Sequence, residues 1–166
     1  MKIWLALVLM LVSFAGAASE LSPFGRGSWD ELRRGHEGRP TIVHFWGLTC
    51  GPCLVELPEW GRFAQSANGA DFVMVAADPV PEEPAQLSAT LAKAGLSPVE
   101  SWRFTDRFTE RLQYEIDSNW RGELPLTILL GRDGSVRSML GTVDFADLRA
   151  WIEQQNRSAA GAGVTR

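Results

Sequence analysis

The spacing of apolar and polar positions predicts that strands and helices alternate along most of the chain. Runs rich in β-branched and aromatic residues predict strands at 41–45, 72–77, 102–105, 126–130 and 136–140. Capping residues and apolar residues at helical spacing predict helices at 28–35, from the cysteines to about 67, at 85–94, at 108–116 and at 144–155. This order, closing with a hairpin, is typical of an α/β fold in which helices flank a mixed central sheet in a single domain.

The first 18 residues have the pattern of a secretory signal peptide. Lys2 supplies the positive charge, residues 3–12 are apolar, and Ala15-Gly16-Ala17 has the small-x-small form that signal peptidase accepts. The apolar run is shorter than the roughly 20 residues that span a bilayer, which favours a cleaved signal over an uncleaved membrane anchor. The export signal predicts a periplasmic or other extracytoplasmic protein.

The remaining chain divides by composition into three parts. We expect an N-terminal extension at 19–40, one folded domain at 41–156 and a disordered tail of small and polar residues at 157–166. The formal net charge of −4 and the pI of about 5.2 argue against nucleic acid as a partner, because nucleic-acid binding needs a concentrated basic face.

The only two cysteines, Cys50 and Cys53, are candidates for redox chemistry. A disulfide that closes so short a loop removes little entropy from the unfolded chain, so it would be a poor structural staple. The first predicted strand leads directly into the cysteine pair, so the pair lies at the start of the next predicted helix. Unpaired N–H groups and the helix dipole stabilise a thiolate there. We expect Cys50 to be the exposed attacking thiol and Cys53, one turn later, to be the buried resolving thiol.

The segment around the cysteines resembles the active site of thioredoxins. The likeness covers residues 45–53, Phe-Trp-Gly-Leu-Thr-Cys-Gly-Pro-Cys, and continues with Glu56 and Pro58. A glutamate three residues after the second cysteine, followed by x-Pro, is similar to the exported thioredoxin-like disulfide reductases of the TlpA/ResA kind. That branch serves cytochrome c maturation and related thiol chemistry. The resemblance therefore implies a thioredoxin fold and disulfide reductase activity.

The same resemblance assigns roles to residues outside the cysteine pair. It implies that Pro125 is cis and lies beside the cysteines, and that Leu124 presents its backbone to a substrate. The catalytic group would comprise Cys50, Cys53, Glu56 and His44, and the substrate-binding group Trp46, Gly51, Pro52, Leu124 and Pro125. Partners would be protein disulfides and a membrane or periplasmic thiol protein that donates electrons. Neither a cofactor nor a metal is expected.

Two positions depart from the thioredoxin pattern. His44 stands where thioredoxins carry a buried aspartate, and Thr49 where an aromatic residue is common. His44 is either a proton relay to Cys53, with a pKa closer to neutrality than an aspartate, or a core histidine held by a hydrogen bond. Glu56 either handles protons near the thiols or is a first-turn glutamate favoured by the helix dipole. Trp46 is expected both to fill the core and to cover the thiols.

The cysteine pair also has alternative interpretations. The same motif serves disulfide oxidases and isomerases, because the direction depends on the relative stability of the two redox states. A thioredoxin-fold binding module with an inert disulfide is a non-enzymatic alternative. A zinc site would need two more ligands, for which only His36 and His44 are available.

Overall fold

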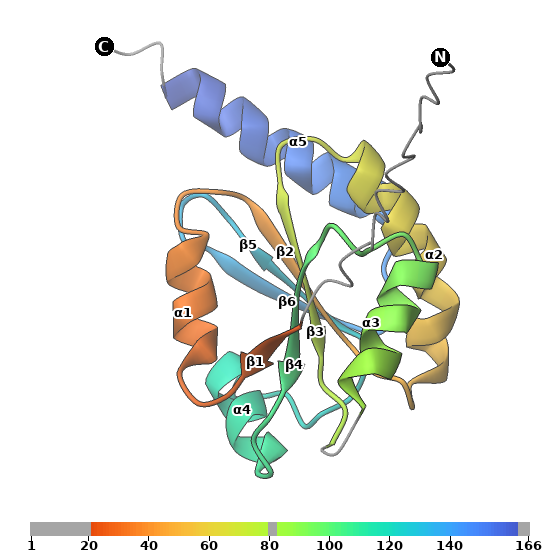
Figure 1. The fold of residues 1–166 in the computed structure, drawn as a ribbon. Coiled ribbons are helices and arrows are strands. Elements are labelled where there is room, and N and C mark those ends of the chain that lie inside the picture. Colours follow the sequence, from red (N-terminus) through yellow and green to blue (C-terminus); the bar gives the residue numbers. More distant parts are fainter. Residues whose placement is uncertain (1–20, 80–82, 163–166) are drawn as a thin grey trace, which may run out of the picture.

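The computed structural model describes residues 21–79 and 83–162 (Figure 1). The predicted signal peptide at 1–18 lies outside the described residues, as do the last four residues of the predicted tail. The elements in chain order are β1 (Ser22–Phe24), α1 (Ser28–Gly35), β2 (Thr41–Trp46), α2 (Gly51–Ser66), β3 (Asp71–Ala76), α3 (Pro84–Lys93), β4 (Glu100–Phe104), α4 (Thr109–Ile116), β5 (Leu126–Leu130), β6 (Val136–Leu140) and α5 (Phe145–Ala162). No helix in this part of the chain is long and apolar enough to cross a membrane.

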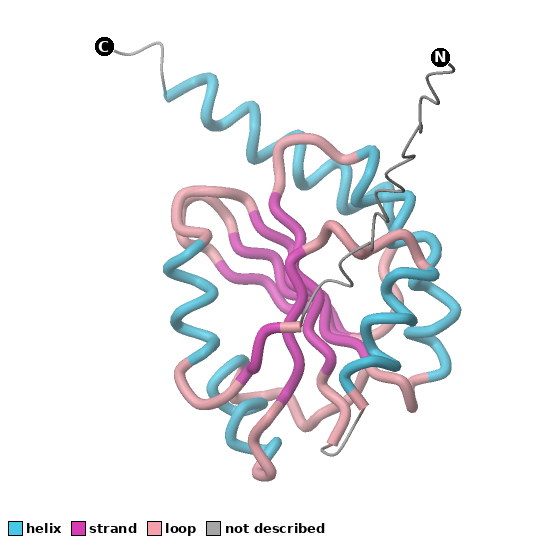
Figure 2. The backbone as a smooth tube through the Cα atoms, in the orientation of Figure 1, coloured by secondary structure: helices cyan, strands magenta, loops and turns pink. Residues whose placement is uncertain are grey.

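The strands form one mixed sheet in the order β1-β4-β3-β2-β5-β6, as Figure 2 shows in magenta. Strands β1 to β4 are parallel neighbours, whereas β5 runs antiparallel to β2 and forms the hairpin with β6. The expected mixed sheet and flanking helices are confirmed. Because β2 and β3 run in the same direction, their carboxyl ends meet at one edge of the sheet, and α2 starts from that edge.

Side chains of β2 alternate between two hydrophobic cores. Ile42 and Trp46 face the core that α2, α3 and α5 cover, whereas Val43 and Phe45 face the core beneath α1 and α4. Figure 1 shows the two groups of helices on opposite sides of the sheet. All six residues of β2 are buried, which explains why its sequence does not alternate regularly between apolar and polar residues.

The N-terminal extension is built into the fold. The strand β1, which the sequence pattern did not predict, pairs with β4 at the edge of the sheet. Its Phe24 is fully buried and contacts the rings of Phe45 and Phe104. The strand is only three residues long and contains Pro23, which lacks an N–H donor and is tolerated at a sheet edge. Residues 21–40 therefore belong to the same domain as the other residues that the structure describes.

The last helix is longer than predicted. The expectation of disorder from residue 157 is wrong for 157–162, which continue α5. Alanine, the strongest helix former, is frequent in this segment. Glu153 and Arg157, one turn apart, form an ion pair at 3.5 Å, and Ser158 Oγ donates a hydrogen bond to the Gln154 carbonyl at 3.0 Å.

Candidate active site

The cysteine pair lies where the carboxyl end of β2 meets the first turn of α2. Cys50 and Cys53 form a disulfide, with Cα atoms 5.3 Å apart. Cys50 is the N-cap of α2, and its Sγ accepts a hydrogen bond from the Cys53 N–H at 3.2 Å. Cys50 is partly exposed, whereas Cys53 is fully buried. The expected difference in access between the two sulfurs is thus confirmed.

The first turn of α2 leaves one side of the disulfide open. Gly51 and Pro52 are both exposed, and the proline occupies the start of the helix, where its missing N–H would have no helical partner. A substrate can therefore approach Cys50 over these two residues.

A cis proline lies at the same edge of the sheet. The Leu124-Pro125 peptide bond is cis, as the resemblance implied. Pro125 directly precedes β5, whose first residue Leu126 pairs with Phe45 near the end of β2. Leu124 is partly buried and packs against the core cluster that contains Cys53. The topology thus brings two segments about 70 residues apart in sequence to one edge.

His44 is a neutral core residue. It is 1 % exposed, its Nδ1 shares a hydrogen bond with Thr127 Oγ1 at 3.0 Å, and its ring packs on Trp60 at 4.4 Å. Its other nitrogen, Nε2, has no hydrogen-bond partner among the described residues. Burial lowers the pKa of His44 from 6.5 to about 3. The expectation of a pKa near neutrality is therefore wrong, because no charged or acidic group offsets the loss of hydration.

Glu56 is a buried carboxyl that ties α2 to the loop after β6. It is 8 % exposed, and its Oε1 accepts a hydrogen bond from the Val143 N–H at 2.9 Å. Burial raises the pKa of Glu56, and the Val143 N–H and the nearby Trp60 indole partly oppose that shift. The Trp60 indole and Glu56 Oε2 do not reach hydrogen-bond geometry with any described group. The carboxyl can thus hold or release a proton on the buried side of the cysteine helix.

Asp78 supports the loop that leads to Cys50, a role that the sequence pattern did not suggest. Its carboxylate is 4 % exposed and accepts three hydrogen bonds: from the Leu48 N–H at 2.6 Å, the Thr49 N–H at 3.2 Å and the Thr49 hydroxyl at 2.9 Å. Gly47 allows this approach, because a Cβ there would lie 2.5 Å from Asp78 Oδ1. The available signal was an aspartate directly after a buried strand, at the edge where α/β folds place their sites.

Comparison with solved structures places this site in a known fold. No protein-family model matches the chain, and no curated protein sequence matches it. The structure of DsbF from Mycobacterium tuberculosis is similar, with a TM-score of 0.59 and 19% identity over 74% of this chain and 84% of that one. StoA from Bacillus subtilis has a TM-score of 0.52 and 24% identity over 69% and 83% of the two chains.

A thiol:disulfide interchange protein of the thioredoxin family from Chlorobium tepidum gives a TM-score of 0.59 and 21% identity, over 74% of this chain and 83% of that one. In this chain the cysteine pair lies at the start of the helix after β2. The chain has the thioredoxin fold. Its structural neighbours are thiol–disulfide oxidoreductases of the kind that the sequence resembles.

One expected site residue does not take its assigned place in this thioredoxin fold. Trp46 is fully buried and belongs to the core under α2. A side chain without exposed surface cannot touch a substrate, so the expectation that Trp46 covers the thiols is corrected. Its indole N–H has no hydrogen-bond partner in the described part of the chain. The other half of the expectation, that Trp46 fills the core, is confirmed.

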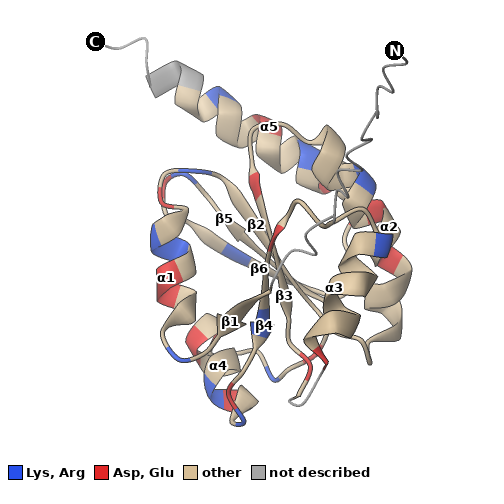
Figure 3. Ribbon diagram, in the orientation of Figure 1, with Lys and Arg blue, Asp and Glu red and all other residues tan. Residues whose placement is uncertain are grey.

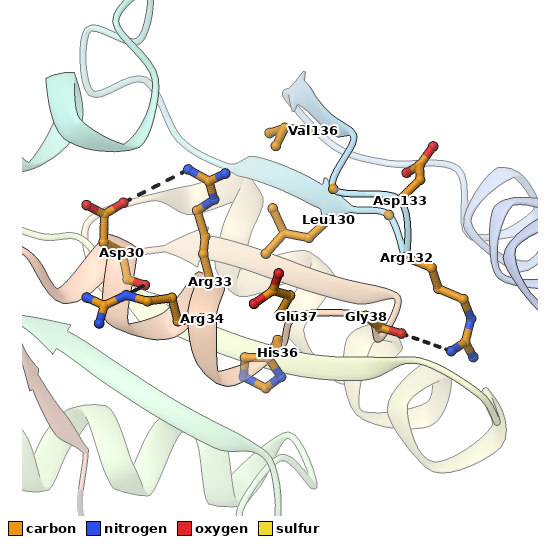
Figure 4. A pocket seen from close by; sticks show the side chains of 12 residues that line it. Asp30, Arg33, Arg34, His36, Glu37, Gly38, Leu130, Arg132, Asp133 and Val136 are labelled. Carbon is orange, nitrogen blue, oxygen red and sulfur yellow. Dashed lines mark hydrogen bonds and ion pairs between the residues drawn. The ribbon is translucent and has the colours of Figure 1, made fainter.

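A charged hollow of about 490 Å³ lies at the opposite edge of the sheet from the cysteines (Figure 4). It is lined by residues of α1, by Gly38 and by the β5–β6 turn, including Leu130, which pairs with the first residue of β2. Arg132 spans this region and donates a hydrogen bond to the Gly38 carbonyl at 3.0 Å. Because β2 is six residues long, this hollow is about 20 Å from the cysteines and is no part of the thiol site.

The described residues contain no cluster of three or more histidine, cysteine or acidic side chains that could hold a metal ion.

Proposed function

We propose that the protein is an exported thiol–disulfide oxidoreductase that reduces disulfides in other proteins. The observation that carries this proposal is the unequal exposure of the two cysteines: Cys50 is partly exposed at the helix N-terminus, and Cys53, one turn later, is fully buried. An attacking thiol must reach a substrate, whereas a resolving thiol needs only to reach the first sulfur. An inert structural disulfide does not require this difference in exposure between its two cysteines.

The reaction needs two exchange steps. In the reduced protein, the Cys50 thiolate attacks one sulfur of a substrate disulfide, which forms a mixed disulfide and releases the other substrate sulfur as a thiolate. Cys53 then loses its proton and attacks Cys50 Sγ, which releases the second substrate thiolate and restores the Cys50–Cys53 disulfide. Two electrons pass from the protein to the substrate. The raised pKa of Glu56 suits it to accept the Cys53 proton, directly or through water.

Substrate would bind across the exposed first turn of α2 and the cis-proline loop. Gly51 and Pro52 offer a flat, exposed surface beside Cys50. The cis peptide bond of Leu124 and Pro125 lies at the same edge of the sheet, where the Leu124 backbone would pair with an extended substrate segment.

The electrostatic surroundings of Cys50 favour reduction as the direction. The one hydrogen bond to its Sγ among the described residues comes from the Cys53 N–H, so the helix N-terminus is the main source of thiolate stabilisation. The Asp78 carboxylate lies beneath the adjacent loop and places negative charge nearby. A strong oxidant needs a highly stabilised thiolate. We expect the Cys50 thiolate to be less stabilised than that of a strong oxidant, which would make the dithiol the better electron donor.

This role implies a place in the cell and partners. An extracytoplasmic location follows from the signal-like residues 1–18, and reduction in an oxidising compartment requires a membrane or periplasmic thiol protein that supplies electrons. The cysteine pair of a c-type cytochrome precursor is one substrate of the branch that the sequence resembles, and it fits a reductase of this kind.

The direction is tested by the reduction potential of the Cys50–Cys53 pair. The protein would be equilibrated with defined thiol buffers, alkylated, and separated on a gel that resolves the two states. We expect a potential near or below about −250 mV, close to that of thioredoxin and far from the roughly −120 mV of a strong oxidant. A value above about −180 mV would contradict reduction and identify the protein as a disulfide donor or isomerase.

A further inference from the structure

A groove runs between α2 and α3, beside the reactive cysteine. It has a volume of about 550 Å³, within the range of sites that hold ligands. Leu48 and Leu54 line the end nearest the cysteines: one precedes Cys50 by two residues and the other follows Cys53 directly. Leu54 is 40% exposed, so its apolar side chain is accessible at this end of the groove. The groove is therefore a continuation of the surface around Cys50.

The far end of the groove is closed. A side chain at Gly61 would collide with the Ala94 carbonyl, so the end of α3 is in close backbone contact with α2. Gln65 reinforces this contact with a hydrogen bond to the Gly95 carbonyl at 3.5 Å. The groove thus opens toward the cysteines. From Gln86 to Lys93 the lining spans about 10 Å of helix, which is the length of about three extended residues.

The lining is mostly apolar, with two uncharged polar residues, Gln86 and Thr90, and one charge. Leucine, proline and alanine side chains form most of the walls, and Lys93 at the closed end is the one charged residue in the lining. Helix α3 contains no acidic residue, as Figure 3 shows by the lack of red along it. Lys93 is the only lysine of the chain apart from Lys2. A segment that fills this groove should carry apolar side chains near Cys50 and a carboxylate near Lys93.

We propose that this groove binds the segment next to the target cysteine of the substrate protein. The segment is extended, has apolar residues directly beside the cysteine, and has an acidic residue about three or four positions away. This inference rests on the proposed function, because it assumes that Cys50 attacks a disulfide in a bound polypeptide. It extends that function by naming the substrate sequence that the enzyme prefers.

The test uses peptides that carry one cysteine as a mixed disulfide with 5-thio-2-nitrobenzoate. The reduced full-length protein attacks the peptide sulfur through Cys50 and releases the coloured nitrobenzoate thiolate. Cys53 then displaces the peptide thiol and forms the Cys50–Cys53 disulfide. The reference peptide has two leucines, an alanine and a glutamate beside its cysteine. It is made in two versions: in one these four residues follow the cysteine, and in the other they precede it in reverse order. Comparison peptides replace both leucines by serine, or the glutamate by lysine.

Each rate is divided by the rate with the symmetric nitrobenzoate disulfide, which is too small to fill the groove. We expect one of the two versions of the leucine–glutamate peptide to have a normalised rate about tenfold higher than that of the serine peptide. Ala89→Arg, which fills the groove, should abolish the preference, and Lys93→Glu should favour the lysine peptide over the glutamate peptide. Ala92→Arg is the matched control, because Ala92 is exposed on α3 outside the groove, and it should keep the wild-type preference.

The outcomes separate this proposal from the proposed function. If the protein fails to react with the small disulfide, the proposed function is wrong. If it reacts with the small disulfide and shows equal normalised rates for all peptides, only the groove proposal is overturned. A dimer of the wild type that Ala89→Arg converts to a monomer would assign the groove to a second copy and would also overturn the proposal. If Ala89→Arg does not fold, the change of preference in Lys93→Glu decides the question.

Discussion

The buried His44 makes a measurable prediction about stability and pH. The folded protein holds this imidazole neutral until the pH falls to about 3, whereas the unfolded chain protonates it near 6.5. Between these values the unfolded state binds more protons, so stability is lost as the pH falls through this window. From the two pKa values, His44 alone should remove about 3 kcal/mol of unfolding free energy between about pH 8 and about pH 4.

The assay is urea unfolding of the oxidised protein at several pH values, followed by tryptophan fluorescence. His44→Asn keeps a polar group opposite Thr127 but does not titrate, so its stability should fall by about 3 kcal/mol less than that of the wild type over the same range. Thr127→Val is the control: it removes the hydroxyl partner at 3.0 Å and leaves the buried imidazole in place. Its pH dependence should follow the wild type.

Equal pH dependence in the wild type and His44→Asn, within about 0.5 kcal/mol, would contradict a strongly lowered pKa of His44. It would mean that His44 is hydrated or paired in the folded protein. The proton-relay hypothesis would then regain support, because an imidazole with a pKa near neutrality could exchange protons with Cys53.

Two further changes test the surroundings of the cysteines. Asp78→Ala removes three hydrogen bonds to the loop before Cys50 and should lower the unfolding free energy by about 2 kcal/mol or more. The control, Asp106→Ala, removes one hydrogen bond in an exposed loop and should lower the unfolding free energy by less than about 0.5 kcal/mol. Similar losses in the two variants would contradict a supporting role for Asp78. Glu56 has a raised pKa, so the folded protein keeps its proton where the unfolded chain has lost it, and stability should fall as the pH rises above the usual glutamate range. Glu56→Gln should remove this fall in unfolding curves, and an unchanged fall would show that another group causes it.

The sequence pattern predicted the elements well where local composition decides them. The runs at 72–77 and 126–130 are apolar and β-branched, and both are strands within one residue of the expected bounds. The strand β1 could not be predicted, because three residues with a proline carry no periodicity and the strand depends on pairing with β4, about 80 residues away. The end of α5 was predicted too early, because a segment of small and polar residues is typical of a disordered tail. The alanines in this segment nevertheless favour a helix.

The candidate site was predictable only in part, for a similar reason. Cys50 and Cys53 are close in sequence, and the helix start that activates them is a local feature. The roles of the other groups depend on contacts across the chain. Asp78 reaches Thr49 from 29 residues away, and Glu56 reaches Val143 from 87. The pKa of His44 depends on complete burial under Trp60, which no local pattern reveals.

In the proposed reaction, Cys50 attacks substrate disulfides and Cys53 resolves the mixed disulfide. Trapping tests it most directly: Cys53→Ser and Cys50→Ser are each incubated with disulfide-containing proteins, and covalent adducts are separated on a non-reducing gel. Cys53→Ser should accumulate mixed disulfides that a reductant releases, because the exposed thiol can still attack and nothing resolves the product. Cys50→Ser should accumulate few, because Cys53 has no exposed surface. Equal trapping by the two variants, or trapping by Cys50→Ser alone, would contradict the account.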